Sequence, residues 1–448
     1  MNMLKIMNID IDIGITLLYR LWTVFAGAVL LFVIPVYLSP SEQGYYFTIA
    51  SLIALQVFFE LGFNFVVTQT ISHEMGKVNI TENLKLYGNT NSLLKIRSLI
   101  DSLHKWYIKI ALTFFTVVFI LGVIFFYNSA LPVMRWMPVW AAVAFFSAVN
   151  LYFGPYYSVI EGFGFVAKVA KIRLIQSIFG YFVFVLVLMF GYGLYALPCI
   201  SGMTAVITVF WITRTFKAIK FESDLDSKTI EICCDEQISW KRDILPLQWK
   251  LAISWFSGYL IFQLFNPVLF KNQGAEVAGK VGLALTIFST ILSISMSWVN
   301  AKVPTISRHI ANANFKFVNG IFRRLVLKSS IVNLTIIVLF DLFVIFLGAF
   351  ESSLVHRLPT LDILLMLSLV SLINHLIFCM ALYMRAFKDE PLLICSLVSG
   401  VIISILVFLG SLYSANVTIL FYLLVTAFVS FPWVLFVFIR YRQGVALK

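Results

Sequence analysis

The stretch LLICSLVSGVIISILVFLGSL, residues 392–412, runs for 21 residues without one charged side chain. About 20 mostly apolar residues in a helix span the hydrocarbon core of a bilayer, so this stretch predicts a transmembrane helix. The rest of the 448-residue chain has the same character, since 61% of its residues are hydrophobic and only 12% are charged. Soluble proteins carry about 25% charged residues. We therefore predict a polytopic membrane protein.

A search for stretches of membrane-spanning length gives twelve candidates along the chain. They cover approximately residues 14–38, 45–70, 108–128, 133–160, 166–191, 193–213, 250–270, 277–301, 325–348, 361–385, 391–412 and 416–439. Lipid offers no hydrogen-bond partners for open backbone groups, and no short alternating segments of a β-barrel are present in the sequence. We predict an all-α integral membrane protein.

The basic residues indicate how the spans are oriented. With the N-terminus on the cytoplasmic side, 28 of the 33 Lys and Arg residues fall in cytoplasmic segments and four fall in outer loops. Cytoplasmic loops of membrane proteins are enriched in Lys and Arg. The net charge of +12 therefore reflects topology rather than a nucleic-acid partner, and both termini are predicted to be cytoplasmic.

The two halves of the chain contain short matches in the same order. They are Pro35-Val36 with Pro267-Val268, Glu42 with Glu276, and Thr70-Ile71-Ser72 with Thr305-Ile306-Ser307. This order predicts two six-helix lobes, residues 1–213 and 250–448, joined by a cytoplasmic linker at 214–249. Because six is even, both lobes would have the same orientation, related by a pseudo-two-fold axis along the membrane normal.

Polar residues inside the first two predicted spans are candidates for a substrate cavity. Arg20 lies about two turns into the first span, where it would either bind an anion such as a phosphate or extend to the inner interface. The second span carries a stripe at spacing four: Gln56, Glu60, Asn64 and Thr68. Glu60 lies at a depth where it could pair with Arg20, either as a structural ion pair or as a pair that separates during transport.

Further candidates lie in the second half. Lys250 is either an interfacial anchor or a contact for an anionic substrate. Ser293 and Ser297 lie on one face of their helix, where small residues also serve close helix packing. Asn266-Pro267 could kink the seventh span.

Ion coupling has three candidate residues, Glu60, Asp341 and His375, because a buried carboxylate or a His can titrate near neutral pH. His375 could equally be a hydrogen-bonded packing residue. No metal site or cofactor is predicted. The segment GAEVAGKV (274–281) resembles a P-loop, but it lacks the hydroxyl residue that binds magnesium and no buried strand precedes it.

Several motifs resemble those of one transporter family. LSPSEQGYY (38–46), FELGF (59–63), TISHE (70–74) and WVNAKVPTISR (298–308) are similar to motifs of Wzx-type polysaccharide flippases of the multidrug/oligosaccharidyl-lipid/polysaccharide (MOP) superfamily. Two departures leave the substrate open: Ser39 stands where the family usually has Gly, and Glu60 stands where Asp is commoner. The twelve predicted spans fit this family over the whole chain.

The resemblance implies a function without enzymatic catalysis. It implies a bacterial inner-membrane flippase that moves an undecaprenyl-diphosphate-linked oligosaccharide, such as an O-antigen unit of lipopolysaccharide, to the outer leaflet by alternating access. Membrane lipids, a polysaccharide polymerase and a chain-length regulator are further candidate partners. The alternatives are an ion-coupled small-molecule exporter of the same superfamily, a membrane-embedded glycan polymerase or ligase, which would need larger outer loops, and a purely structural membrane protein.

Overall fold

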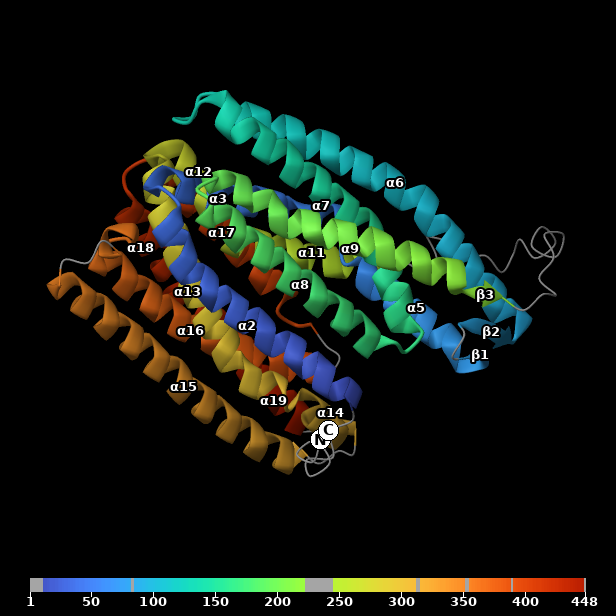
Figure 1. Ribbon diagram of the computed structural model, residues 1–448. Helices are drawn as coiled ribbons and strands as arrows, with labels where there is room; N and C mark the ends of the chain where they lie inside the picture. The colour runs from blue at the N-terminus through green and yellow to red at the C-terminus, as the bar shows by residue number, and fades with distance from the viewer. Residues whose placement is uncertain are drawn as a thin grey trace. The chain divides into compact units, whose positions relative to one another are not determined.

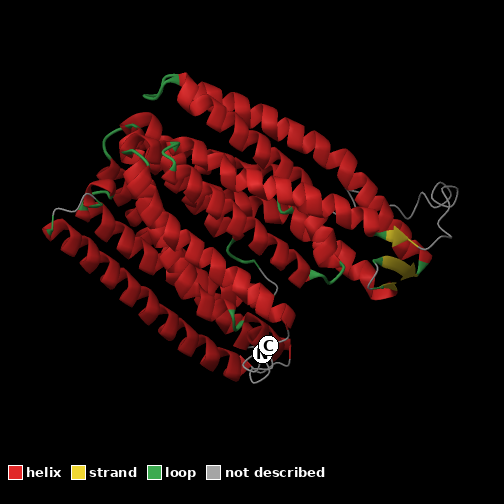
Figure 2. Ribbon diagram, viewed as in Figure 1, coloured by secondary structure: helices red, strands yellow, loops and turns green. Residues whose placement is uncertain are grey.

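The computed structural model describes residues 11–81, 84–221, 245–311, 315–350, 354–387 and 390–446. Helices dominate these residues (Figure 2). Eleven helices in this part of the chain are long and apolar enough to cross a membrane, and a bent pair, Pro40–Glu60 with Phe63–Lys77, makes up to twelve spans if counted as one. The predicted all-α integral membrane fold is confirmed. The protein is a multi-pass membrane protein.

Helix α2 (Ile11–Tyr37) is shared between two compact units of the chain. The first unit holds Leu52–Trp255 together with the chain up to Thr23. The second unit holds Val24–Ser51 together with the chain from Phe256 onward. Residues 24–51 thus group with later helices, whereas the sequence assigned them to an N-terminal lobe of residues 1–213. The boundaries of the lobes and their pseudo-two-fold relation stay predictions.

The first unit is built around α7, which packs against α5, α6, α8 and α9 (Figure 1). Its elements are η1 (Ala54–Gln56), α4 (Val57–Glu60), α5 (Phe63–Glu74), η2 (Met75–Lys77), α6 (Thr90–Phe126), α7 (Val133–Gly162), α8 (Val166–Met189), η3 (Gly193–Ala196), α9 (Leu197–Ala218) and the first part of α11 (Leu245–Phe262). Helix α6 is longer than the predicted span at 108–128 because it continues through the preceding polar segment.

A small sheet, which the sequence did not predict, joins two connections of the first unit. Strand β2 (Lys85–Gly88) pairs antiparallel with β1 (Val78–Ile80) and parallel with β3 (Lys220–Phe221). It therefore holds the chain after α5 beside the chain after α9, next to the start of α6.

The second unit is built around α13 and α16, which pack against each other and against α15. Its elements are α3 (Pro40–Ile53), the end of α11, α12 (Phe265–Gln273), α13 (Ala275–Asn300), α14 (Val303–Ala311), α15 (Phe315–Ala349), η6 (Val355–Arg357), α16 (Leu361–Ala386), α17 (Leu393–Ser411), α18 (Ala415–Val425), the π-helical turn η7 (Thr426–Ser430) and α19 (Phe431–Ala446). Residues 263–264 separate α11 from α12, so the predicted seventh span is interrupted shortly before Asn266-Pro267, where the sequence predicted a kink.

The motif at 38–46 forms a tight helix start. Ser39 Oγ accepts a hydrogen bond from the Glu42 backbone N–H at 3.2 Å, and Glu42 Oε2 accepts one from the Ser39 backbone N–H at 3.0 Å. This is a capping box, with Pro40 at the first helical position, where its missing N–H costs nothing. Gln43 Nε2 donates to the Gly279 carbonyl at 2.9 Å. A side chain at Gly44 would place its Cβ 1.8 Å from the Ala275 carbonyl oxygen, so only glycine fits there.

Candidate functional site

A break in the second predicted span places Glu60 at a helix end. Helix α4 ends at Glu60 and α5 begins at Phe63. The longer segments that meet here, Pro40–Glu60 and Phe63–Lys77, are bent by 42°. Leu61 (φ 46°) and Gly62 (φ 71°) both adopt left-handed backbone conformations. Glycine adopts this conformation freely, whereas for leucine it costs about 1–2 kcal/mol. Strained residues of this kind cluster at functional and switch sites.

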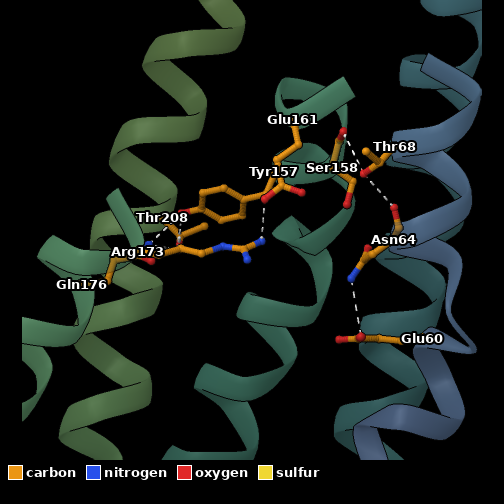
Figure 3. Close-up of polar contacts among 9 residues, drawn as sticks. All are labelled: Glu60, Asn64, Thr68, Tyr157, Ser158, Glu161, Arg173, Gln176 and Thr208. Carbon is orange, nitrogen blue, oxygen red and sulfur yellow. Dashed lines mark hydrogen bonds and ion pairs between the residues drawn. The ribbon is translucent and has the colours of Figure 1, made fainter. Parts of the chain in front are cut away.

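The predicted polar stripe stays connected across this break. Gln56 Nε2 donates to Glu60 Oε1 at 2.5 Å, and Asn64 Nδ2 donates to Glu60 Oε2 at 3.5 Å. Thr68 Oγ1 lies 3.1 Å from the Asn64 carbonyl oxygen and 3.3 Å from the Ser158 carbonyl oxygen of α7 (Figure 3). The four stripe residues therefore form one hydrogen-bonded series that runs from the break to α7.

Arg20 is not the partner of Glu60. Among the described residues, the guanidinium of Arg20 and the carboxylate of Glu60 form no ion pair, and the Arg20 side chain is exposed. Helix α2 instead contacts α8 through Trp22, whose indole N–H donates to Ser177 Oγ at 2.8 Å. The expected Arg20–Glu60 pair is therefore absent, and Arg20 remains available to another anion.

Arg173 of α8 pairs with Glu161 of α7. Arg173 Nη2 lies 3.2 Å from Glu161 Oε1, and its guanidinium carbon lies 5.6 Å from the centre of the Tyr157 ring. Figure 3 shows Arg173 reaching along Tyr157 toward Glu161. Sequence analysis did not select Arg173 and Glu161 because both were assigned to the cytoplasmic segment between the fourth and fifth predicted spans.

A neutral hydrogen-bonded group fixes Tyr157 beside this ion pair. Gln176 Nε2 donates to Tyr157 Oη at 2.7 Å and to Thr208 Oγ1 at 2.8 Å. The Tyr157 ring stacks on Trp211 with ring centres 5.6 Å apart. Helices α7, α8 and α9 are thus held together at the level of the ion pair. We define Gln56, Glu60, Asn64, Thr68, Tyr157, Glu161, Arg173, Gln176 and Thr208 as the charged cluster of the first unit.

The second unit contains a cavity of about 590 Å³ between α13 and α16. Ser293 lines it, whereas Ser297 is exposed and does not. The other hydrogen-bonding side chains of its wall are uncharged except Arg385, and they are Gln263, Asn266, Thr286, Ser289, Asn300, Ser371, Asn374 and Tyr422. Sequence analysis did not assemble this group because its members come from four helices, α12, α13, α16 and α18, and from the turn between α11 and α12.

The proposed coupling residues of the second half lie apart from each other. Asp341 accepts a hydrogen bond from Ser368 Oγ at 2.9 Å. His375 is 1% exposed and its Nε2 lies 3.1 Å from Ser329 Oγ. Each residue thus meets a serine of the facing helix. Lys250 lies in α11, but its side chain is outside the described residues. Among the described residues, no three His, Cys, Asp or Glu side chains form a group that could hold a metal ion.

Comparisons with known proteins find similarity in structure only. No protein-family model matches the chain, and no curated protein does. A lipid II flippase MurJ in an inward closed conformation has a TM-score of 0.64 at 12% identity, with 98% of this chain and 91% of that chain covered. An inward-facing multidrug resistance MATE transporter of the MOP superfamily has a TM-score of 0.53 at 12% identity, with 93% of this chain and 99% of that chain covered.

A third solved structure extends the same likeness. A MOP superfamily transporter from Pyrococcus furiosus has a TM-score of 0.51 at 11% identity, with 97% of this chain and 93% of that chain covered. These neighbours are transporters and flippases, and each likeness runs over nearly the whole of both chains. This protein has the fold of the MOP superfamily transporters.

Proposed function

We propose that this protein is a flippase that moves an undecaprenyl-diphosphate-linked oligosaccharide from the cytoplasmic to the outer leaflet of a bacterial inner membrane. The observation that carries the proposal is the likeness to the lipid II flippase over 98% of this chain with a TM-score of 0.64. The motifs at 59–63 and 70–74 support the same substrate class. The oligosaccharide would be an O-antigen unit or a related surface polysaccharide repeat.

The charge of the diphosphate explains why a protein is needed. An unpaired charge cannot enter hydrocarbon without a very large cost in free energy. Arg20 supports a route for this charge, because it lies within a membrane-spanning helix, is exposed, and forms no ion pair with a described residue. A guanidinium donates two parallel hydrogen bonds to a phosphate, which suits it to this task.

Deletion of the gene tests the proposal directly. Cells without the protein should accumulate lipid-linked oligosaccharide on the inner leaflet and lose surface glycan. Arg20→Ala should not restore surface glycan, although its protein abundance equals that of the wild type, while Arg20→Lys should restore part of it. Normal surface glycan in the deletion strain would refute the flippase, and normal glycan with Arg20→Ala would remove only Arg20 from the mechanism.

Glu60 is our first candidate for ion coupling, with Asp341 and His375 as further candidates. The break at Leu61–Gly62 and the two amide donors on Glu60 support a carboxylate whose hydrogen bonds change as the helix changes shape. Collapsing the proton gradient or removing sodium should stop transport by the wild type. Glu60→Gln should abolish this dependence if Glu60 carries the coupling ion, and should preserve it if another residue does.

The second candidate function is export of small molecules, which the MATE neighbours favour. Exporters of cationic compounds need acidic cavity groups, and the described wall of the second-unit cavity contains Arg385 and no carboxylate. Drug susceptibility of the deletion strain distinguishes the two functions. A rise in susceptibility with normal surface glycan would favour the exporter.

A further inference from the structure

The cavity of the second unit has the size of a ligand site. Its volume is about 590 Å³, and ligand pockets span about 300–1,000 Å³. Its walls come from α13 and α16, with the end of α11, the start of α12 and Tyr422 of α18.

Two buried polar atoms in this wall have no partner among the described residues. Ser371 is 4% exposed and its hydroxyl makes no hydrogen bond. Asn266 is 9% exposed; its Nδ2 donates to Ser51 Oγ at 3.0 Å, but its carbonyl oxygen accepts nothing. A buried polar group without a hydrogen bond costs about 1–3 kcal/mol. Both residues line the cavity, so a rotation of either side chain toward the cavity would let a ligand with hydroxyl groups supply the missing partner.

A third polar side chain is fixed in position beside them. Asn374 Nδ2 donates to Tyr422 Oη at 3.1 Å, and this bond orients the amide. The Tyr422 ring is held in turn by Phe265, with ring centres 4.8 Å apart. The wall therefore presents oriented amide and hydroxyl groups that both donate and accept without net charge.

Aromatic rings supply the apolar part of the wall. Phe262 and Phe378 meet edge to face with ring centres 5.9 Å apart, and Phe288 lines the cavity from α13. Sugar rings combine apolar C–H faces with a rim of hydroxyl groups. They match a wall that pairs aromatic surfaces with uncharged hydrogen-bonding groups, whereas a cationic drug or a plain acyl chain does not.

Arg385, the single charged residue among the described residues that line the cavity, lies toward one end of it. Arg385 also lines a second cavity of about 530 Å³, together with Asn300 and Leu382. Its Nε lies 3.4 Å from Glu390 Oε1, and its side chain is exposed. An anionic group attached to the sugar would therefore find its cation where the two cavities meet, outside the uncharged part.

We propose that this cavity is the subsite that holds the sugar rings of the lipid-linked oligosaccharide. Ser371 and Asn266 bind sugar hydroxyls, and Phe378 packs against a ring face. This inference rests on the proposed function. It adds that recognition of the glycan takes place inside the second unit.

Photo-crosslinking of the reconstituted full-length protein tests the subsite. Benzoylphenylalanine replaces Phe378 in one sample and Leu369 in the matched control, which lies on the same helix, is exposed and does not line the cavity. The probe is a polyprenyl diphosphate that carries a neutral disaccharide with a fluorescent tag on the sugar. Wild-type protein is first tested for movement of this probe across the liposome membrane.

Position 378 should capture the tagged sugar at least about tenfold more than position 369, which corresponds to 1.4 kcal/mol. Equal capture at both positions, or capture of the polyprenyl chain alone at 378, overturns the subsite while the flippase stands. If wild-type protein does not move the probe, the proposed function fails and the subsite fails with it.

Ser371→Ala separates ligand binding from packing. Removing a buried hydroxyl without a partner should leave the melting temperature unchanged or raise it. The same change should raise the half-saturating concentration of the sugar-bearing probe about tenfold, since a site built to bind hydroxyls discriminates through them. Transport of polyprenyl diphosphate without sugar should not change.

Ser371→Phe fills the cavity and should stop transport of the sugar-bearing probe only. A lower melting temperature with Ser371→Ala and equal loss for both probes would assign Ser371 to packing and overturn the inference.

Discussion

The charged cluster of the first unit and the cavity of the second unit differ in whether their polar groups have partners within the protein. In the cluster, Glu60 meets two amide donors and Glu161 meets Arg173 at 3.2 Å. In the cavity, the polar groups are uncharged apart from Arg385, and Ser371 and Asn266 each have an atom without a protein partner.

The difference teaches where a substrate can be accommodated. An unpaired charge within the membrane is costly, and the charged cluster pairs its own charged and polar groups, which suits it to rearrangement. Neutral groups cost less when unpaired, so the second unit can keep them open for a ligand. Both interpretations predict distinct consequences of substitution.

The largest expected effect is that of Glu60→Ala. The change leaves the half-buried Gln56 and Asn64 amides without their acceptor, and an unsatisfied group costs up to about 1–3 kcal/mol when fully buried. Thermal unfolding in detergent should show a clear loss of stability, and Glu60→Gln, which keeps an acceptor, should lose much less. Equal melting temperatures for the wild type and both variants would show that these hydrogen bonds do not stabilise the structure at the break between α4 and α5.

Two glycine substitutions, one in each unit, should lower stability by similar amounts. A Cβ at Gly162 would lie 2.6 Å from Ile71 Cβ, and a Cβ at Gly282 would lie 2.7 Å from Asn266 Oδ1. Overpacking of this kind costs about 1–3 kcal/mol, so Gly162→Ala and Gly282→Ala should both lower the melting temperature.

Only Gly282→Ala should also weaken capture of the sugar-bearing probe, because it displaces Asn266. Gly258→Ala is the control, since nothing lies within 4 Å of its Cβ. Weaker capture with Gly162→Ala as well would erase the functional difference between the units.

Substitution of Leu61 should change stability less, and one of its variants should be more stable than the wild type. Asparagine tolerates the left-handed conformation better than leucine, so Leu61→Asn should raise stability by up to about 1 kcal/mol. Leu61→Val should lower it, because a β-branched side chain fits this conformation poorly. The two variants are compared by thermal unfolding, and a stabilising valine would contradict the strained backbone.

The smallest effect is expected for Arg173→Lys. The Arg173–Glu161 pair is partly exposed, and such pairs contribute less than about 1 kcal/mol. Lysine should therefore preserve both stability and transport. A large loss of transport at unchanged stability would show that the guanidinium acts beyond Glu161.

The sequence predicted most of the fold, because apolar runs of membrane length are unambiguous. The expected span at 166–191, for example, matches α8 (Val166–Met189) closely. The break at Leu61–Gly62 was missed, because FELGF has the hydropathy of a continuous helix and leucine gives no sign of a left-handed backbone. The small sheet was missed because its strands have two to four residues each.

The candidate site was only partly predictable. The stripe from Gln56 to Thr68 lies on one segment, so its period revealed it. The Arg20–Glu60 pair failed because depth along two helices does not determine which faces meet. Asn266, Ser371 and Tyr422 line one cavity through the packing of three helices, which a single sequence without contacts cannot specify.

The capping box at Ser39–Glu42 has a consequence for assigning genes. The residues of the 38–46 motif cap a helix and pack it against its neighbours, and the described contacts of Ser39, Glu42, Gln43 and Gly44 all serve this purpose. A relative found through this motif should therefore be credited with the architecture alone. Under the proposed subsite, its cargo should be inferred from the positions that correspond to Asn266, Ser371 and Phe378.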